Sequence, residues 1–172
     1  MRLLTTYRRF FYNKKIWATV FVCLFTQAQV VAQNPPYISY NEQNGISTSV
    51  VYGLFQDSED NVWFCTNTGA VKFNGNKLVL YGKKDGIPGN EVFKIFEDSY
   101  HRLWFMTASG RIAFYRNKRI YNEKDFPVFS KVKLSSFISD IREDKDKKIW
   151  IIPDKGNIYC LAPDLSSFAE VP

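Results

Sequence analysis

One short pattern occurs three times in this chain of 172 residues and limits what the chain can fold into. In each copy an aspartate precedes a tryptophan by six residues, and the tryptophan precedes a glycine by six residues. The copies consist of Asp57, Trp63 and Gly69, of Asp98, Trp104 and Gly110, and of Asp144, Trp150 and Gly156. The tryptophans are 41 and 46 residues apart. A period in the low forties is typical of solenoids, propellers and other arrays of one structural unit.

Each repeat holds short runs of β-branched and aromatic residues, which favour β-strands. In the first two repeats these runs are VVYGLF (50–55), VWFCT (62–66), AVKF (70–73), KLVLY (77–81), EVFKIF (91–96), LWFMT (103–107), RIAFY (111–115) and KRIY (118–121). Polar turn residues such as Asn74-Gly75-Asn76 separate them. Outside the N-terminus, no window shows the spacing of apolar residues that helical repeats need. Four short strands per repeat predict an all-β fold made of four-stranded antiparallel β-propeller blades.

The chain is predicted to contain about three blades, in repeats over residues 37–81, 82–126 and 127–172. The third repeat is less regular, because Pro153 ends its second strand and proline cannot donate a sheet hydrogen bond. Tyr37–Tyr40 aligns with the fourth strand of a blade, a position that one terminus supplies in many closed propellers. Three blades form an incomplete ring with exposed outer faces, so we expect the isolated chain to be poorly folded or associated.

The N-terminus has the features of a secretory signal peptide over residues 1–32. Basic residues are followed by the apolar run Ile16–Phe25 and then by small residues. Cleavage is predicted after Ala32, with Ala28 as a second candidate, so that the mature partial propeller covers residues 33–172. An uncleaved membrane anchor is the alternative, although the run is shorter than the roughly 20 apolar residues that a spanning helix needs. Cys23 lies inside the apolar run, which disfavours it as a lipoprotein cysteine.

The net charge of +6 does not indicate a nucleic-acid partner. The basic residues Arg2, Arg8, Arg9, Lys14 and Lys15 all precede the apolar run. Without these five, basic and acidic residues are almost equal in number and are interleaved along the chain. A nucleic-acid-binding surface requires clustered positive charge, so the sequence predicts no nucleic-acid partner.

The residues that mark the repeats are predicted to be structural. Each Trp is expected to fill the core, each Asp to accept hydrogen bonds within a turn, and each Gly to supply positive φ or close backbone approach. His101, the only histidine, is expected in a turn with left-handed backbone, and Cys65 and Cys160 are expected to act as small buried apolar residues. No serine-hydrolase, zinc-protease, P-loop or CxxC motif is present, so no catalytic residue, metal site or cofactor is predicted.

Two segments carry a family resemblance: NGIS followed by VVYGLFQDSEDNVWFCTNTGAVKFNG, and DGIPGNEVFKIFEDSYHRLWFMTASGRIAFYRN. They resemble two-component regulator propeller repeats, whose pattern is roughly NGL, a strand, D-x-x-G-x-x-W-x-G-T, then G-L and a strand. The resemblance extends over residues 37–161 and is weaker in the third repeat. The chain departs from this pattern at two glycines, which are replaced by Asp60, His101 and Lys147 before the tryptophans and by Cys65, Met106 and Ile152 after them.

The resemblance implies the periplasmic sensor region of a membrane histidine kinase or hybrid two-component protein, typical of Bacteroidetes. Such a sensor binds an extracellular small molecule or glycan fragment and relays the signal across the inner membrane. This chain resembles the N-terminal part of such a sensor, so the further blades and the membrane and kinase regions are the expected partners. The chain itself has no kinase motif and is not expected to be an enzyme. Connections such as Lys83–Asn90 and Tyr100–Arg102 are candidates for contacting the ligand, but the sequence does not assign the ligand-binding residues.

Two other functions remain open at this point. The first is a secreted propeller enzyme, a glycan hydrolase or lyase, because the Asp-to-Trp turns resemble the Asp-box of sialidases. The repeats lack the serine and the glycine of that motif, which counts against this function. The second is a propeller that binds another protein and no small ligand.

Overall fold

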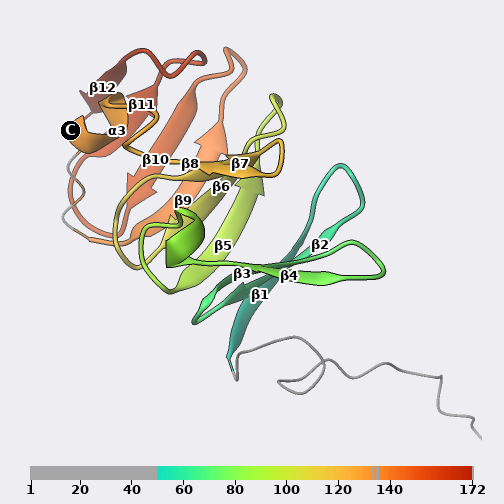
Figure 1. The fold of residues 1–172 in the computed structure, drawn as a ribbon. Helices are drawn as coiled ribbons and strands as arrows, with labels where there is room; N and C mark the ends of the chain where they lie inside the picture. The colour runs from blue at the N-terminus through green and yellow to red at the C-terminus, as the bar shows by residue number, and fades with distance from the viewer. Residues whose placement is uncertain (1–49, 133, 135, 172) are drawn as a thin grey trace, which may run out of the picture. The chain divides into compact units, whose positions relative to one another are not determined.

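The computed structural model describes residues 50–132, 134 and 136–171, and it contains three sheets in chain order (Figure 1). The chain divides into the units Met1–Ile38 and Ser39–Pro172, and every described residue belongs to the second. Each sheet has four antiparallel strands in the order of the sequence. This confirms the predicted all-β fold of about three propeller blades, and the described residues do not close a ring.

Each blade is an up-and-down meander of consecutive strands. The first blade consists of β1 (Val51–Gln56), β2 (Val62–Thr66), β3 (Gly69–Phe73) and β4 (Leu78–Tyr81). The middle blade consists of β5 (Val92–Glu97), β6 (Leu103–Thr107), β7 (Phe114–Arg116) and β8 (Arg119–Tyr121). The third blade consists of β9 (Ile138–Glu143), β10 (Ile149–Pro153), β11 (Ile158–Leu161) and β12 (Phe168–Val171).

The first hairpin of every blade has the same register. Leu54 pairs with Phe64 in the first blade, Ile95 with Phe105 in the middle blade, and Ile141 with Ile151 in the third. Each hairpin also carries a register shift near the start of its first strand, as at Val51/Gly53 and Val92/Lys94. Positions related by the sequence repeat are therefore also related in the three-dimensional structure.

Two strands differ in detail from the sequence-based prediction. β7 begins at Phe114 rather than Arg111, because residues 108–113 form a wider turn in which the backbone N–H of Arg111 donates to Ser109 Oγ at 3.2 Å. Pro153 is the last residue of β10 and lies at a register shift. A shift at this point fits a residue that has no N–H to donate to the sheet.

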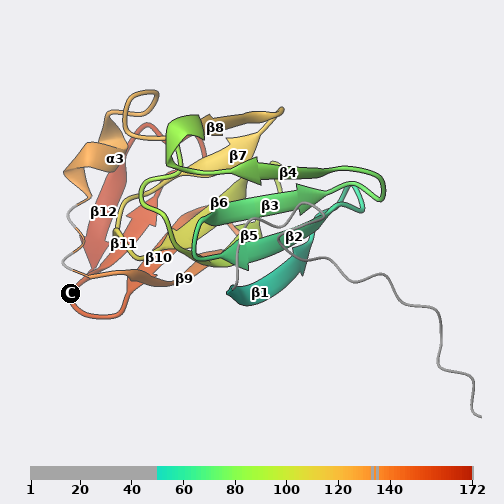
Figure 2. The ribbon, with the colours of Figure 1, turned by 60° about the horizontal axis from the view of Figure 1, so that its bottom comes forward.

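The blades stack face against face, with the middle blade between the other two (Figure 2). Trp63 and Cys65 of the first blade pack with Ile95, Phe105 and other residues of the middle blade in one apolar cluster. Trp104 and Met106 of the middle blade pack in a second cluster with residues of the third blade, namely Ile138, Ile141, Ile149, Ile151, Tyr159 and Leu161. The hydrophobic core therefore consists of two layers, one at each contact between blades.

The meander gives the blades two distinct ends. We call the end with the β1–β2, β5–β6 and β9–β10 turns the hairpin end. The opposite end, the connection end, holds the links between blades. These are residues 82–91 with the 3-10 helix η1 (Lys83–Asp85), and the described residues 122–132, 134, 136 and 137 with the short helix α3 (Val128–Lys131). The β6–β7 turn, residues 108–113, also lies at the connection end.

The predicted signal peptide, its cleavage sites and the strand Tyr37–Tyr40 lie outside the described residues. Within residues 50–171 as described, no helix has the length and apolar character that crossing a membrane requires.

Candidate ligand-binding groove

The repeated aspartates organise the turns at the hairpin end. Asp57 Oδ1 accepts hydrogen bonds from the backbone N–H of Glu59 and Asn61 at 3.0 and 2.8 Å, and its Oδ2 accepts from the Trp63 indole at 2.7 Å. Asp98 and Asp144 accept the matching indole hydrogen bonds, from Trp104 at 2.7 Å and from Trp150 at 2.8 Å. The prediction of turn-forming aspartates is confirmed, and the bond to the tryptophan six residues later explains why both residues recur together.

These hydrogen bonds also affect the ionisation of Asp57 and Asp144. Burial by itself would raise the pKa of Asp57, but the hydrogen bonds from Trp63 and Asn61 outweigh it and hold the pKa below its ordinary value. The Trp150 indole likewise lowers the pKa of Asp144. Carboxylates held ionised by donors from their own turn are poor proton donors at neutral pH, so the geometry supports a structural role.

Positive φ occurs at His101 and at the repeated glycines, as the sequence predicted, and also at the positions equivalent to His101 in the other two repeats. Asp60, His101 and Lys147 have φ values of 63°, 58° and 65° at the turn position that is glycine in the family pattern. Gly69 and Gly110 combine positive φ with close approach, since a Cβ would lie 2.1 Å from Tyr81 O and 2.3 Å from Ser136 O. His101 therefore serves as a turn residue, as expected.

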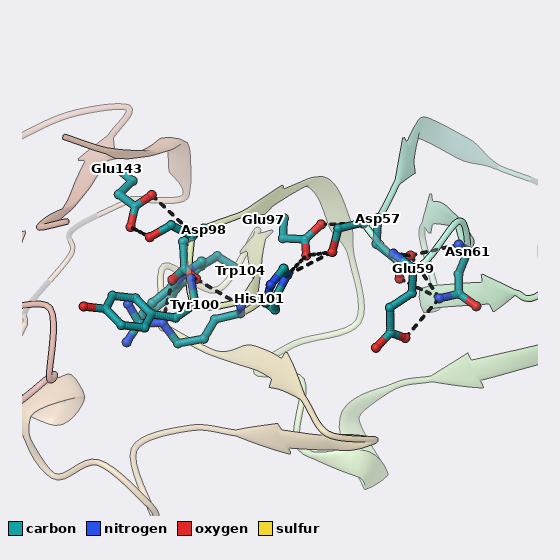
Figure 3. A network of polar contacts seen from close by, with 12 residues as sticks. Asp57, Glu59, Asn61, Glu97, Asp98, Tyr100, His101, Trp104 and Glu143 are labelled. Carbon is teal, nitrogen blue, oxygen red and sulfur yellow. Dashed lines mark hydrogen bonds and ion pairs between the residues drawn. The ribbon is translucent and has the colours of Figure 1, made fainter. Parts of the chain in front are cut away.

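A polar contact between neighbouring blades repeats at the hairpin end (Figure 3). Glu97 accepts hydrogen bonds from the backbone N–H and hydroxyl of Ser58 in the preceding blade, at 2.8 and 2.6 Å. Glu143 accepts the same pair from Ser99, at 3.0 and 2.6 Å. We call this contact the serine–glutamate clasp. His101 Nδ1 lies 3.0 Å from Glu97, so the one histidine of the chain belongs to this contact.

Arg102 lies in the core of the hairpin end. Its side chain is 5% exposed, and its Nε donates to Asp98 Oδ2 at 2.5 Å. One of its terminal nitrogens reaches the third blade and donates to Pro163 O at 2.9 Å, and its guanidinium lies 5.2 Å from the Trp104 ring centroid. These contacts make Arg102 a link between blades.

Of the two cysteines in the described part of the chain, Cys65 is buried as predicted, whereas Cys160 is only partly buried, and both thiols are free. Cys65 is 1% exposed between the first two blades, and burial raises its pKa to about 12. Cys160 is half-buried, and burial raises its pKa as well. No cluster of His, Cys, Asp and Glu suited to a metal ion occurs within the described part of the chain.

The connection end contains a groove of about 430 Å³. Its walls come from three segments that are distant in sequence, namely the β4–β5 connection, the β6–β7 turn and the β8–β9 connection. Polar and charged side chains from all three line it: Lys83, Ser109, Arg111, Asn122, Glu123 and Lys124. A second hollow of about 370 Å³ shares Ser109, Arg111 and Glu123 with it and extends to Phe129.

Hydrogen bonds and close packing fix the shape of the groove. Ser109 Oγ donates to Pro88 O at 2.5 Å, and Asn122 Nδ2 donates to Gly86 O at 3.0 Å. Gly89 has a φ of 108°, and a Cβ there would lie 3.3 Å from the Ser109 side chain. These contacts tie the β4–β5 connection to the other two segments, so the groove is largely formed before any ligand arrives.

The two segments named from the sequence as ligand candidates lie at opposite ends of the blades. The segment Lys83–Asn90 contributes Lys83 and the stretch Gly86–Gly89 to the groove. Tyr100 and Arg102 belong to the hairpin end, where Arg102 is buried. The structure therefore brings the first segment into a concave polar site and leaves the second outside it.

Sequence reasoning missed the groove residues of the other two segments. Arg111 was predicted to begin a strand, and Asn122, Glu123 and Lys124 were not singled out. The signal that pointed to them is the longer spacing of the second repeat, 46 rather than 41 residues between tryptophans. The added length falls in the β8–β9 connection, which forms one wall of the groove.

Comparison with protein families matches two segments of the chain, residues 45–68 and 86–109, to the model described as "Two component regulator propeller". The chain therefore carries two-component regulator propeller repeats. The first match ends in the turn after β2, and the second begins directly after η1 and covers β5 and β6. Both matched repeats include the Asp, the Trp and the positive-φ residue of the hairpin turn.

A search of curated proteins finds no match to the sequence. Fifteen chains of solved structures are similar to this chain. One is the extracellular domain of a hybrid two-component system protein from B. thetaiotaomicron, with 18% sequence identity and a TM-score of 0.40. The similarity covers 80% of this chain and 27% of that one, so the chain spans about a quarter of the length of its structural neighbour.

Proposed function

We propose that this chain is part of the extracytoplasmic, signal-binding propeller of a two-component sensor, and that the signal binds in the groove at the connection end. The observation that carries the proposal is the pair of two-component regulator propeller repeats, which form adjoining blades. The groove lies where the connections of these blades meet and is polar, concave and preformed. Sites with these properties are where proteins usually bind small ligands.

The proposal includes export to the periplasm, with a parent protein held in the inner membrane. It rests on the basic and apolar residues that open the sequence in the order of a secretory signal. N-terminal sequencing of the exported protein should find a chain that begins near Gln33. Recovery of a chain that still begins at Met1 would contradict cleavage.

We further propose that the groove binds its ligand without converting it. Glycan hydrolysis normally needs two carboxyl groups on opposite sides of the scissile bond. Among the described residues that line the groove, Glu123 is the one carboxylate. The aspartates of the turns lie at the hairpin end and already accept several hydrogen bonds each. The ligand is proposed to be a small molecule or a glycan fragment, and the remaining parts of the sensor are the proposed partners.

The test is a binding screen of neutral and charged oligosaccharides, with chromatography of the same mixtures to detect products. We expect saturable binding and unchanged oligosaccharides. Lys124→Trp places a bulky side chain in the groove and should abolish binding. Arg116→Trp, at an exposed site near the β7–β8 turn of the hairpin end, is the matched control and should not. Turnover that disappears in Glu123→Gln would overturn the proposal in favour of an enzyme.

A further inference from the structure

The groove has an excess of positive charge. Lys83, Arg111 and Lys124 line it together with a single carboxylate, Glu123. Neither of the two lysine side chains forms an ion pair with a described residue. Three cations in one concave site raise the local concentration of anions, because field lines are focused in clefts with low-dielectric walls.

Arg111 lies in the wall shared by the two hollows and has unused hydrogen-bonding capacity. Its side chain is 67% exposed, and one guanidinium nitrogen lies 3.4 Å from Glu123 Oε1. A guanidinium carries five N–H donors, and no other described residue accepts from this one. Two parallel donors on such a fork match the two oxygens of a carboxylate or sulfate.

The neutral polar groups of the groove are already engaged. The Ser109 hydroxyl contacts Pro88 O and Thr107 Oγ1, and the Asn122 amide donates to Gly86 O. A neutral ligand would therefore find few open donors, whereas a charged one would meet the three cations. Charge rather than hydroxyl recognition is therefore expected to set the selectivity of the groove.

We propose that the groove recognises an oxyanion, a carboxylate or sulfate borne by the ligand, and that Arg111 is its principal contact, with Lys83 and Lys124 adding to the attraction. This inference rests on the proposed sensor function and adds the chemical class of the signal. Glu123 competes with the ligand for Arg111 and thereby weakens the binding of weakly charged molecules. The oxyanion can come from an acidic sugar or from a free small anion, and the two sources are separated by experiment.

Equilibrium dialysis tests the inference on the full exported chain, because it measures binding whether or not the chain associates. The probes are a galacturonic acid trisaccharide, the neutral galactose trisaccharide and inorganic sulfate. We expect the acidic trisaccharide to bind, with an affinity that falls as sodium chloride is raised. The neutral trisaccharide should bind about tenfold more weakly or not at all, since a hydrogen-bonded charge pair contributes about that much.

Four variants separate the charge from the fold. Arg111→Gln should weaken binding of the acidic trisaccharide about tenfold or more, whereas Arg116→Gln, an exposed arginine near the hairpin end, should leave it unchanged. Lys83→Gln should reduce it by a smaller factor. Glu123→Gln should strengthen binding a few-fold, because it removes the competing carboxylate while keeping the size of the side chain. Circular dichroism of each variant checks that the fold is retained.

The outcomes distinguish this inference from the proposed function. Equal binding of the neutral and acidic trisaccharides, unchanged in Arg111→Gln, would contradict oxyanion recognition by the groove. The proposed sensor function would not be affected by this result. If the folded chain binds the acidic and the neutral trisaccharide, and Lys124→Trp does not weaken this binding, the groove is not the binding site. If sulfate competes with the acidic trisaccharide and binds with equal affinity, this would support oxyanion recognition and show that a free anion is sufficient for binding. Failure of both anionic probes to bind a folded chain would contradict the inference.

Discussion

The second strand of the middle blade is more completely buried than the second strands of the two outer blades. All five residues of β6 are buried. In β2, Val62 and Phe64 are partly exposed, whereas Trp63, Cys65 and Thr66 are buried. In β10 the alternation has the opposite phase, since Ile149 and Ile151 are buried while Trp150 and Ile152 are half-buried. The middle blade is covered on both faces, and each outer blade is covered on the one face that meets the middle blade.

This difference shows that repeated residues do not have equal energetic weight. Val51 and Leu54 occupy the positions of Val92 and Ile95 one repeat earlier, yet Val51 is 47% and Leu54 is 67% exposed. Val92 and Ile95 are buried because the first blade packs on them. The following predictions use pairs of equivalent positions, one inside the stack of blades and one on an open face.

The largest difference is expected between Ile95→Asp and Leu54→Asp. Ile95 is 3% exposed, so an aspartate there places an unpaired carboxylate in an apolar layer and should cost about 5 kcal/mol or more, enough to unfold a domain of ordinary stability. Leu54→Asp lies in solvent and should change the free energy of unfolding by less than about 0.5 kcal/mol. Urea unfolding followed by circular dichroism measures both.

The same pair tests whether the open face associates. If the isolated chain self-associates through the first blade, Leu54→Asp should shift sedimentation velocity profiles toward the monomer without loss of structure. A monomeric, cooperatively melting wild-type chain would contradict the expectation that exposed blade faces make the isolated chain associate or fold poorly.

Replacement of the repeated tryptophans gives the next largest effect. Trp104 is fully buried, so Trp104→Ala should destabilise the fold by about 3–5 kcal/mol through loss of packing. Trp150→Ala should cost less, about 1–2 kcal/mol, because the open face of the third blade already leaves Trp150 half-buried. Chemical denaturation of the two variants provides the comparison. Equal losses would mean that another surface covers Trp150 in solution.

Removing the glutamate of a serine–glutamate clasp should give a smaller difference in stability between equivalent positions. Glu143→Ala removes both acceptors of Ser99 and should cost about 1–2 kcal/mol, since hydrogen bonds to a charged group are stronger than neutral ones. Gln56 holds the same place in the first blade, where its amide donates to Asp60 within its own turn. Gln56→Ala should therefore change stability by about 0.5 kcal/mol or less. An equal cost for both variants would show that the clasp does not hold neighbouring blades together.

Thiol labelling should reveal the difference in burial between Cys65, inside the stack of blades, and Cys160, on the open face of the third blade, without changing stability. Cys65 lies between two blades with a pKa raised to about 12, so very little reactive thiolate is present at pH 8. Cys160 pairs with Trp150 on the open side of the third blade and is half-buried. In a Cys23→Ser background we expect Cys160 to be alkylated at least about tenfold faster, as measured by mass spectrometry. Comparable rates in urea are the control, and comparable rates in the native chain would contradict the burial of Cys65.

The family resemblance, the strand pattern and the turn chemistry were readable from the sequence. The Asp-to-Trp spacing and the positions of Asp60, His101 and Gly69 predicted turns that the structure confirms. Such features are local, because a turn is fixed by hydrogen bonds within about six residues. The limits of β7 were less predictable, since the turn before it is held by Ser109, which also contacts the distant β4–β5 connection.

Only the tertiary structure decided which residues share a site and which repeats are buried. Lys83, Arg111 and Glu123 are far apart in the sequence and meet because the meander of each blade returns alternate loops to the same end. Trp104 and Trp150 occupy identical positions in their repeats and differ in burial, since that depends on a neighbouring sheet. The sequence thus determined the local geometry of each blade, whereas the groove and the open faces follow from how the blades stack.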